Sequence, residues 1–369
     1  MSKRKLTDIC SIQYGCAFDA SQFTTLPEEG MPLIRIRDVK DGCTNTYYKG
    51  DYSDEYIIHK GDYLVGMDGE FNIEPWQSED ALLNQRVCKI ESKSEDVLMR
   101  YIYRFLKKEL KRIEDDTPFV TVKHLSAKRL NQVLISVPPL PEQEKIVSEL
   151  DCLSGIIEKK RQQLKELDAL AQSIFYEMFG NPVENEKGFP VYKVDDIITF
   201  QGGSQPDKSN FEYKPTENNI RLIQIRDYKS DKNITYIPKS MAKRLCTADD
   251  IMIGRYGPPI FQILKGIEGA YNVALMKAIP KQGNREFVRA FLKQKCLLEY
   301  LESMSKRTAG QDGIQMDKLK TYPFPLPPLS LQEEFASKIE SIEQQQALIK
   351  QSIVEVETLF NSRMDFYFN

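Results

Sequence analysis

The stretch "GGSQPDKS" at residues 202–209 is the part of this chain that most resembles a phosphate-binding loop. Such loops use glycines so that backbone N–H groups can wrap around a phosphate, and they end in Lys-Ser or Lys-Thr. Asp207 occupies the position where this pattern requires glycine. Its carboxylate would repel phosphate and its side chain would restrict the backbone. The sequence therefore does not predict a nucleotide site here.

An overlapping stretch, "PDKSNFEYK", resembles the signature of metal-dependent nucleases. It places Pro206-Asp207 before Glu212 and Lys214. Two carboxylates and a lysine could hold a divalent cation and polarise a phosphodiester. However, only four residues separate the two acids, too few for the strand pair that usually joins them, and the first half of the chain has no counterpart. We expect an ordinary loop and no metal ligands.

No other catalytic pattern is present. The stretch "GNPVEN" (180–185) lacks the second proline and the aromatic residue of an adenine methyltransferase motif, and no glycine-rich loop for S-adenosylmethionine is found. His59 and His124, the only histidines, are interpreted as surface or packing residues. The seven cysteines show no metal-ligand or disulfide spacing. The sequence predicts a protein without catalytic residues, cofactor or metal ion.

The most informative pattern is a long internal repeat. Several segments recur in the same order further along the chain, and the distance between partners is the same for every pair to within one position. The pairs are "DICSIQYG" (8–15) and "DIITFQGG" (196–203), "PLIRIRDV" (32–39) and "IRLIQIRDY" (220–228), "KGDYLVG" (60–66) and "ADDIMIG" (248–254), and "VPPLPEQEKI" (137–146) and "LPPLSLQEEF" (326–335). A constant offset over several matches indicates that the chain consists of two duplicated halves.

Each half is predicted to contain a globular domain followed by one long helix. The globular domains are expected at 1–138 and 181–327, where short apolar runs broken by Gly, Pro, Asn and Asp are typical of short strands and loops. The helices are expected at 139–180 and 328–369. The proline pairs end the preceding domain because proline fixes φ and lacks an N–H donor. We therefore predict an α+β protein.

Both helices show a heptad pattern, which is typical of a coiled coil. The expected heptad core positions are Ile146, Leu150, Leu153, Ile157, Lys160, Leu164, Leu167, Ala171, Ile174 and Met178, with their partners in the second half at Phe335, Ile339, Ile342, Gln346, Ile349, Ile353, Val356, Phe360, Arg363 and Tyr367. A two-fold relation between the halves would make the two helices antiparallel, and we favour that arrangement.

The charge distribution indicates what this arrangement could bind. Residues 1–138 carry a net charge of −2 and residues 181–327 carry +6, whereas the helices carry −3 and −4. Two similar domains on a stiff helical spacer suit a ligand with two sites at a fixed separation, and duplex DNA is the obvious ligand of that kind. The basic second domain suits phosphate. The first domain would need a local basic patch or a partner, and the acidic helices are expected to bind protein.

This organisation resembles the specificity subunit of a type I restriction–modification system. The most specific features are the "PPLxxQE" junctions with Gln143 and Gln332, the turn at 203–206 and the repeated "LIxIRD" strands, although the first half reads "YGCAFDA" at its turn, without a proline. The resemblance implies two pseudo-symmetric α/β target recognition domains that read a split, asymmetric DNA sequence. It also implies helices that space these domains and bind two adenine methyltransferase subunits, restriction subunits that join the complex, and no catalysis by this chain.

Positions with the same residue in both halves are expected to stabilise the fold or to contact DNA phosphates. Positions that carry different polar residues in the two halves are candidates for contacts to bases. Arg37 and Arg226 belong to the first class, with a structural Arg–Asp pair as the alternative. Arg35 and Gln224 belong to the second, on strands whose isoleucines face the core, and these side chains pair best with guanine and adenine. The other candidates, each also explicable as ordinary loop chemistry, are Gln85, Arg86, Lys123, His124, Arg255, Tyr256, Lys306, Arg307 and Gln311.

Two alternatives remain open at this stage. The chain could be a two-domain coiled-coil adaptor that binds only proteins, which the acidic first domain favours, or it could serve a different class of restriction complex. The start "MSKRKLTDIC" has no apolar segment behind it, and no apolar run approaches the roughly 20 residues of a membrane helix, so we expect a cytoplasmic protein.

Overall fold

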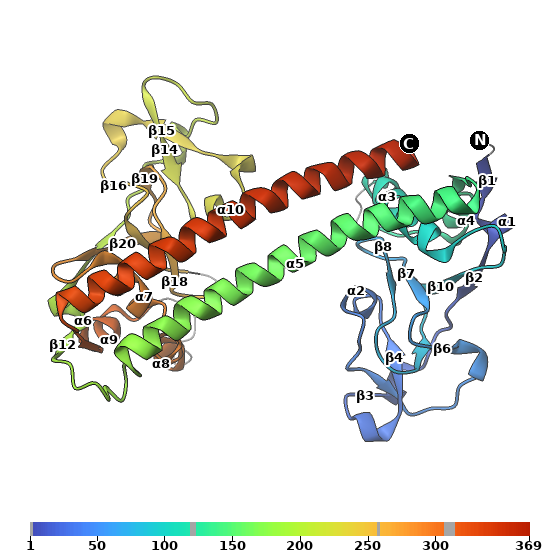
Figure 1. The fold of residues 1–369 in the computed structure, drawn as a ribbon, viewed down its shortest axis with the longest axis horizontal. Coiled ribbons are helices and arrows are strands. Elements are labelled where there is room, and N and C mark those ends of the chain that lie inside the picture. Colours follow the sequence, from blue (N-terminus) through green and yellow to red (C-terminus); the bar gives the residue numbers. More distant parts are fainter. Residues whose placement is uncertain (1–2, 119–122, 257–258, 306–313) are drawn as a thin grey trace. The chain divides into compact units, whose positions relative to one another are not determined.

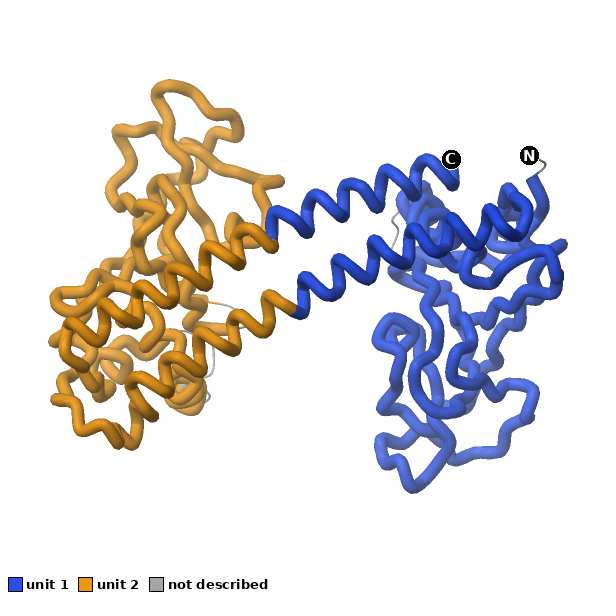
Figure 2. The backbone as a smooth tube through the Cα atoms, in the orientation of Figure 1, with its two compact units in different colours: residues 1–162, 350–369 blue, residues 163–349 orange. Residues whose placement is uncertain are grey.

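The computed structural model describes residues 3–118, 123–256, 259–305 and 314–369. The chain divides into two compact units, which Figure 2 distinguishes by colour. Unit 1 contains residues 1–162 and 350–369, and unit 2 contains residues 163–349. The helices α5 (Leu140–Phe179) and α10 (Leu329–Phe368) each contribute one half to either unit. No helix in the described ranges is long and apolar enough to cross a bilayer.

The globular part of unit 1 contains three sheets (Figure 1). An antiparallel sheet has the strand order β2-β10-β7-β8, a mixed sheet has the order β3-β5-β4-β9-β6, and β1 pairs with β11. The elements are β1 (Lys3–Lys5), α1 (Leu6–Ile9), β2 (Cys10–Tyr14), β3 (Phe23–Thr24), β4 (Met31–Ile34), α2 (Asp38–Asp41), β5 (Tyr47–Tyr48), β6 (Ile57–Ile58), β7 (Tyr63–Gly66), β8 (Asn72–Pro75), β9 (Ala81–Leu83), β10 (Val87–Ser92), α3 (Met99–Asp115), α4 (Ala127–Asn131) and β11 (Leu134–Ser136).

Unit 2 repeats this plan. Its sheets have the orders β13-β20-β17-β18 and β15-β14-β19-β16, and β12 pairs with β21. The elements are β12 (Val191–Lys193), α6 (Val194–Ile197), β13 (Ile198–Gly202), β14 (Asn219–Ile223), β15 (Tyr236–Pro238), β16 (Leu245–Cys246), β17 (Ile251–Gly254), β18 (Gln262–Lys265), β19 (Gly269–Tyr271), β20 (Leu275–Pro280), α7 (Arg285–Leu292), α8 (Lys295–Ser305), α9 (Met316–Thr321) and β21 (Pro323–Pro325).

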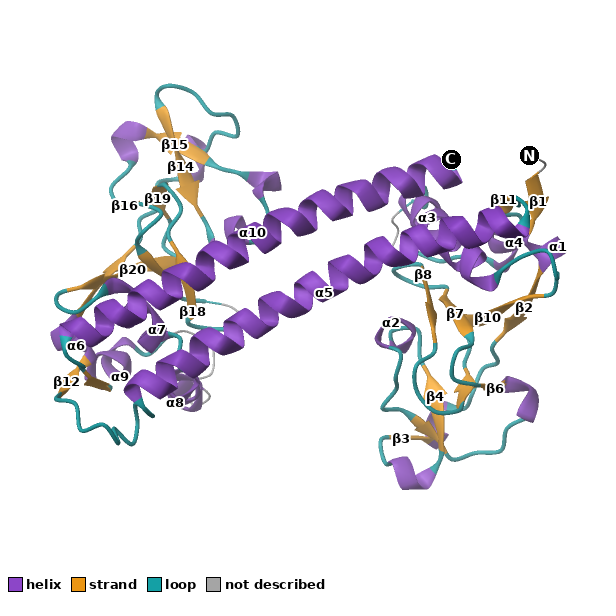
Figure 3. Ribbon diagram, in the orientation of Figure 1, coloured by secondary structure: helices purple, strands orange, loops and turns teal. Residues whose placement is uncertain are grey.

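The duplication holds at the level of strand pairing. Each mixed sheet contains a single parallel pair, β4 with β9 in unit 1 and β14 with β19 in unit 2. Even the short pairing of β3 with β5 has a counterpart, an isolated bridge between Glu212 and Tyr236 in unit 2. Figure 3 shows short strands together with helices in both units. The predicted α+β class is therefore confirmed.

The halves of α5 and α10 pair in opposite directions within each unit. In unit 1, the Tyr367 hydroxyl donates to Glu149 at 2.5 Å, and Arg161 pairs with Glu357 at 2.7 Å. In unit 2, Phe335 packs against Phe175 and Phe179, and Gln346, further along α10, donates to Asp168, which lies earlier in α5, at 2.8 Å. The predicted antiparallel arrangement is confirmed.

One heptad position needs correction. Arg363, expected at a heptad core position, is exposed and pairs with Glu149 at 2.8 Å, while the adjacent Met364 is buried. A straight helix has 3.6 residues per turn, so a strict heptad drifts around it, and the globular domain offers Met364 a core. Where unit 1 has the single helix α3, unit 2 has the two helices α7 and α8.

The repeated glutamine of the proline motif fastens each long helix to its globular domain. The Gln143 amide is fully buried; it donates to the carbonyls of Pro138 (2.7 Å) and Asp96 (2.8 Å) and accepts from the Leu98 N–H (2.9 Å). Leu98 is the N-cap of α3, so this amide satisfies one of the N–H groups that a helix start leaves free.

Gln332 does the same in unit 2. It donates to the Pro327 carbonyl at 2.6 Å and accepts from the N–H of Asn284, the N-cap of α7, at 2.7 Å. The motif recurs because both halves need the same buried joint between a long helix and the first helix of the domain.

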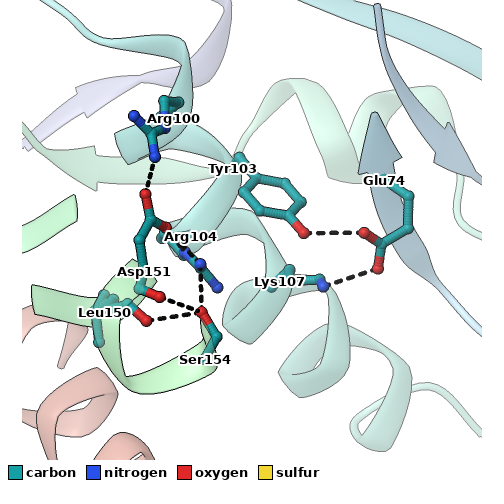
Figure 4. A network of polar contacts seen from close by, with 8 residues as sticks. All are labelled: Glu74, Arg100, Tyr103, Arg104, Lys107, Leu150, Asp151 and Ser154. Atoms are coloured by element: carbon teal, nitrogen blue, oxygen red, sulfur yellow. Dashed lines mark hydrogen bonds and ion pairs between the residues drawn. The ribbon is translucent and has the colours of Figure 1, made fainter. Parts of the chain in front are cut away.

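A polar network in unit 1 joins α3 to α5 and β8 (Figure 4). The largely buried Arg104 binds Asp151 through Nε at 2.9 Å and Ser154 through Nη2 at 2.8 Å. On its other side, α3 contacts β8 through Tyr103 and Lys107, which bind Glu74 at 2.9 and 2.8 Å. The helix that carries the PPLxxQE motif is thereby held to the sheet that positions the candidate loops.

Candidate nucleic-acid interface

Several candidate residues of unit 1 come together where β7 ends. The Met67 N–H donates to the Arg86 carbonyl at 2.9 Å, and the Met67 carbonyl accepts from the Leu125 N–H at 2.7 Å. These bonds bring together the loops 67–69, 84–86 and 123–124, which we call the loop cluster of unit 1. It contains the predicted candidates Gln85, Arg86, Lys123 and His124.

Asp68 is the centre of this cluster, and sequence reasoning missed it. Its carboxylate pairs with His124 Nδ1 at 2.5 Å and with Arg86 Nε at 3.5 Å. Arg86 also approaches His124, with Nη1 3.3 Å from Nδ1. Arg86 has a φ of 73°, a left-handed conformation that is uncommon for a residue with a side chain. The carboxylate holds this exposed guanidinium in place and offsets part of its charge.

The other two candidates of the cluster make mainly local contacts. Lys123 Nζ donates to the Glu114 carbonyl at the end of α3. Gln85 donates its N–H to the Cys16 carbonyl at 2.7 Å and leaves its side chain exposed. Of the two side chains, that of Gln85 is therefore free to contact a ligand.

The equivalent place in unit 2 keeps one of these backbone hydrogen bonds and has different side chains. The Arg255 N–H donates to the Ala274 carbonyl at 2.9 Å, and in the repeat this bond is the counterpart of the one from Met67 to Arg86. The Arg255 guanidinium lies over the ring of the exposed Tyr256, 5.3 Å from its centroid, and donates to the Val273 carbonyl at 3.3 Å. We call residues 255–256 and 272–274 the loop cluster of unit 2.

A shared framework fixes both clusters. Asn84 and Asn272 are buried, and their Oδ1 atoms accept backbone N–H groups at 2.8 and 3.1 Å, respectively. Gly15 and Gly203 pass directly against them: an added Cβ would lie 2.2 Å from the Asn84 carbonyl oxygen and 1.9 Å from that of Asn272. Only glycine allows this approach. The repeat offset gives the signal that identifies these four positions.

Arg35 and Gln224 do not lie on strands, contrary to the sequence prediction. β4 ends at Ile34 and β14 ends at Ile223. The reason is an aspartate three residues after each position: Asp38 Oδ2 accepts the Arg35 N–H at 2.8 Å, and Asp227 accepts that of Gln224 at 3.1 Å. At each aspartate the chain leaves the strand direction and forms a short helix.

These turns lie beside the ends of β7 and β17. The side chain of Ile36 covers Gly66, and that of Ile225 covers Gly254. The turns therefore lie next to the loop clusters of their units. The two side chains differ in freedom: Arg35 is exposed, whereas Gln224 is half-buried and donates from Nε2 to Thr235 Oγ1 at 3.0 Å.

Arg37 and Arg226 are exposed on the same turns. Their guanidinium groups lie 3.7 and 4.0 Å from the next aspartate, a loose contact, because that carboxylate is mainly engaged with the backbone. Arg226 also donates to Thr235 at 3.0 Å.

The acidic side chains of the stretches that resembled a phosphate-binding loop and a nuclease signature bind neighbouring groups of the protein. The Asp207 carboxylate accepts from the backbone and the hydroxyl of Ser209 at 2.9 and 2.7 Å, and these bonds hold the pKa of Asp207 below its usual value. Glu212 binds Asn219 at 2.5 Å, and His59 pairs with Asp80 at 2.8 Å. Among the described residues, no three His, Cys, Asp or Glu side chains are grouped to hold a metal ion. The remaining candidates, Lys306, Arg307 and Gln311, lie outside the described residues.

Comparisons with known proteins match both halves of the chain. The family model for the type I restriction modification DNA specificity domain matches residues 1–168 and 186–358. The solved structure of a type I restriction-modification system S subunit from M. genitalium aligns with a TM-score of 0.58 at 13% identity, over 100% of this chain and 96% of that one. A chain from a structure on complex assembly and conformational transition of the type I R-M system aligns with a TM-score of 0.52 at 17% identity, over 100% and 97%.

Two curated relatives carry names of the same kind. The chain is 43% identical over 162 residues to the EcoBI type I restriction enzyme specificity subunit of Escherichia coli, covering 44% of this chain and 34% of that protein. It is 22% identical over 350 residues to the MjaVIII specificity subunit of Methanocaldococcus jannaschii, covering 85% of this chain and 79% of that protein. The alignment with EcoBI thus spans about a third of that relative's length.

Proposed function

Since this chain belongs to the family of type I restriction modification DNA specificity domains, we propose that it is the DNA-recognition subunit of a type I restriction–modification complex. Each unit reads one part of a split DNA target. The first recognition domain is residues 1–138 and the second is residues 181–327. Because the two domains differ in sequence, the two parts of the target differ as well.

The observation that carries this proposal is a shared framework of glycine contacts, backbone hydrogen bonds and Asp-capped turns that carries different side chains in the two units. The bond from Met67 to Arg86 has its counterpart in the bond from Arg255 to Ala274, and the close Asn–Gly contacts and the Asp-capped turns also recur at equivalent positions. The side chains on this framework do not recur: Asp68 corresponds to Tyr256, and Arg86 corresponds to Ala274. This is the pattern expected of two copies of a reader that recognise different bases.

The long helices supply the spacer and the surface for partner subunits. A helix of 40 residues is about 60 Å long at 1.5 Å per residue, which is enough for a fixed gap between two recognition domains. The outward faces of α5 and α10 bind adenine methyltransferase subunits, two per specificity subunit, and restriction subunits complete the complex. Methylation and cleavage belong to these partners, and this chain supplies sequence recognition.

Selection from a random DNA library tests the proposal. The chain is co-purified with its methyltransferase subunit, and the duplexes that it retains are sequenced. We expect enrichment of two unlike short blocks separated by a constant gap. Enrichment of one uninterrupted block, or of none, would exclude a two-part reader.

A further inference from the structure

The two recognition domains differ strongly in charge where they carry their candidate contacts. The stretch 16–86 of unit 1 and the stretch 204–274 of unit 2 begin and end at equivalent positions of the repeat, and we call them recognition spans 1 and 2. Span 1 has 6 basic and 14 acidic residues, a net charge of −8, whereas span 2 has 11 and 8, a net charge of +3. Two recognition spans of the same fold thus carry net charges of opposite sign.

The ion pairs increase this contrast. In span 1, three of the six cations, Lys40, Lys49 and Arg86, pair with carboxylates at 3.1 to 3.5 Å, and Arg37 makes only its loose contact with Asp38. The pair of Lys40 with Glu70, at 3.1 Å, is typical. A cation that already has a carboxylate partner gains less from a phosphate, because the partner's negative charge remains beside it.

Span 2 leaves most of its cations unpaired. Seven of them are exposed, and no described carboxylate lies within 4.0 Å of their charged atoms. They are Lys208, Lys214, Lys229, Lys232, Lys239, Lys243 and Arg244. All lie in the connections before β14, between β14 and β15, and between β15 and β16, which are strands of one sheet.

These observations have an electrostatic consequence. Each phosphate that a protein cation neutralises releases condensed counterions, which supplies the affinity that is independent of DNA sequence. At physiological ionic strength charges are screened over about 8 Å, so the charge of each span acts mainly on the DNA beside it. Span 2 can therefore gain more from counterion release than span 1, which has an excess of carboxylates.

We infer that DNA is held unequally: recognition span 2 anchors the phosphate backbone and carries most of the salt-dependent affinity, whereas span 1 reads its half-site with little ion release. This inference rests on the proposed function and refines it. Sequence reading by unit 1 then depends on prior anchoring through unit 2 and on the cations of partner subunits. If the exposed lysines of span 2 only kept the protein soluble, replacing them would leave its affinity for DNA unchanged.

A pair of matched variants of the full chain tests the inference. One variant combines Lys229→Gln, Lys239→Gln and Lys243→Gln in span 2. Its control combines Lys40→Gln, Lys49→Gln and Lys60→Gln in span 1; Lys40 and Lys229 are equivalent positions, and all the replaced lysines are solvent-accessible. Circular dichroism melts establish that both variants are folded.

The measurement is the affinity for a fluorescent random-sequence duplex of about 40 base pairs, titrated between about 50 and 200 mM salt. We expect the span 2 variant to lose roughly 2–3 units of the slope of log K against log salt and at least about tenfold in affinity at 100 mM, while the span 1 control changes less than about twofold. Equal losses in both variants, an unchanged slope in the span 2 variant, or no binding by the unmodified chain at low salt would overturn the inference.

The salt titration and the selection of a DNA motif test the inference and the proposed function separately. Random-sequence DNA reports only the sequence-independent attraction, whereas the proposed function is tested by the motif selected together with the methyltransferase subunit. A two-block motif combined with equal slopes would refute the unequal anchoring and retain the function. Unequal slopes without a two-block motif would refute the function.

Discussion

Asp38 and Asp227 have a structural role, although their sequence pattern resembles a binding motif. The repeated Arg-Asp pair suggested either a salt bridge or a phosphate contact. In the structure each aspartate accepts the N–H of the residue three positions earlier, ends the strand and turns the chain. The guanidinium groups lie 3.7 and 4.0 Å from these carboxylates and stay exposed, although Arg226 also donates to Thr235 at 3.0 Å. The aspartate thus serves the fold, and the arginine stays available to a ligand.

The first prediction concerns Arg35, whose side chain is exposed beside the loop cluster of unit 1. Arg35→Gln replaces a donor pair suited to guanine by an amide suited to adenine. We expect a change of preferred base at one position of one half-site, with discrimination altered by about 1–3 kcal/mol. Sequencing of methylated adenines in cells that express the variant measures this preference.

Lys60→Gln, an exposed change on the same domain, is the control and should leave the motif unchanged. An unaltered motif in the Arg35→Gln variant would exclude Arg35 as a base reader. For Gln224, whose amide is engaged with Thr235, we expect substitution to cost stability as well as to alter specificity.

At the scale of elements, the joint between each long helix and its domain depends on one buried amide. Gln143→Leu removes three hydrogen bonds and leaves the N–H of Leu98 and the carbonyl of Pro138 without their partner. An unsatisfied buried polar group costs about 1–3 kcal/mol, so we expect the free energy of unfolding to fall by at least that amount. Urea denaturation followed by circular dichroism measures it.

Glu144→Leu, at the exposed neighbouring position, should change stability by no more than about 0.5 kcal/mol. If the two variants had the same stability, the glutamine joint would contribute nothing. A similar loss in Gln332→Leu would show that both junctions use the same device.

The network of Figure 4 gives a second prediction at this scale. Asp151→Asn leaves the buried guanidinium of Arg104 without its carboxylate. Breaking a buried pair costs roughly 3–5 kcal/mol, and the partial exposure of Asp151 reduces our expectation to about 1–3 kcal/mol. Arg100→Gln, which removes the exposed partner of the same carboxylate, should cost less than about 1 kcal/mol. Chemical denaturation of both variants compares them, and an equal loss would contradict the role of burial.

The sequence predicted the elements that periodicity and repetition encode. The long helices and the α+β class follow from the heptads and from the constant offset of the repeat. The antiparallel pairing was favoured because a two-fold relation between the halves would produce it. Asp68 was missed because its partners are distant: His124 follows it by 56 residues, and no local pattern joins them. The ends of β4 and β14 were misplaced because the Asp–backbone bond is a matter of geometry, not of hydrophobic period.

At the scale of the whole molecule, the duplication explains both what is constant and what differs. Two copies of one domain inherit the same strand order, the same Asn–Gly framework and the same glutamine joint. Once these elements fix the backbone, the exposed loop side chains and the net charge can diverge without affecting the core. Recognition can therefore change in one half while the other half and the helices stay as they are.

The central claim is that the two units read two different parts of one DNA target. The most direct test is the methylome of a host without adenine methylation that expresses this chain together with its own methyltransferase subunit. We predict one motif made of two unlike short blocks with a fixed unspecified gap, and we predict that replacing residues 181–327 by a related domain changes only one block. A single uninterrupted motif, or no methylation by a complex shown to assemble, would contradict the claim.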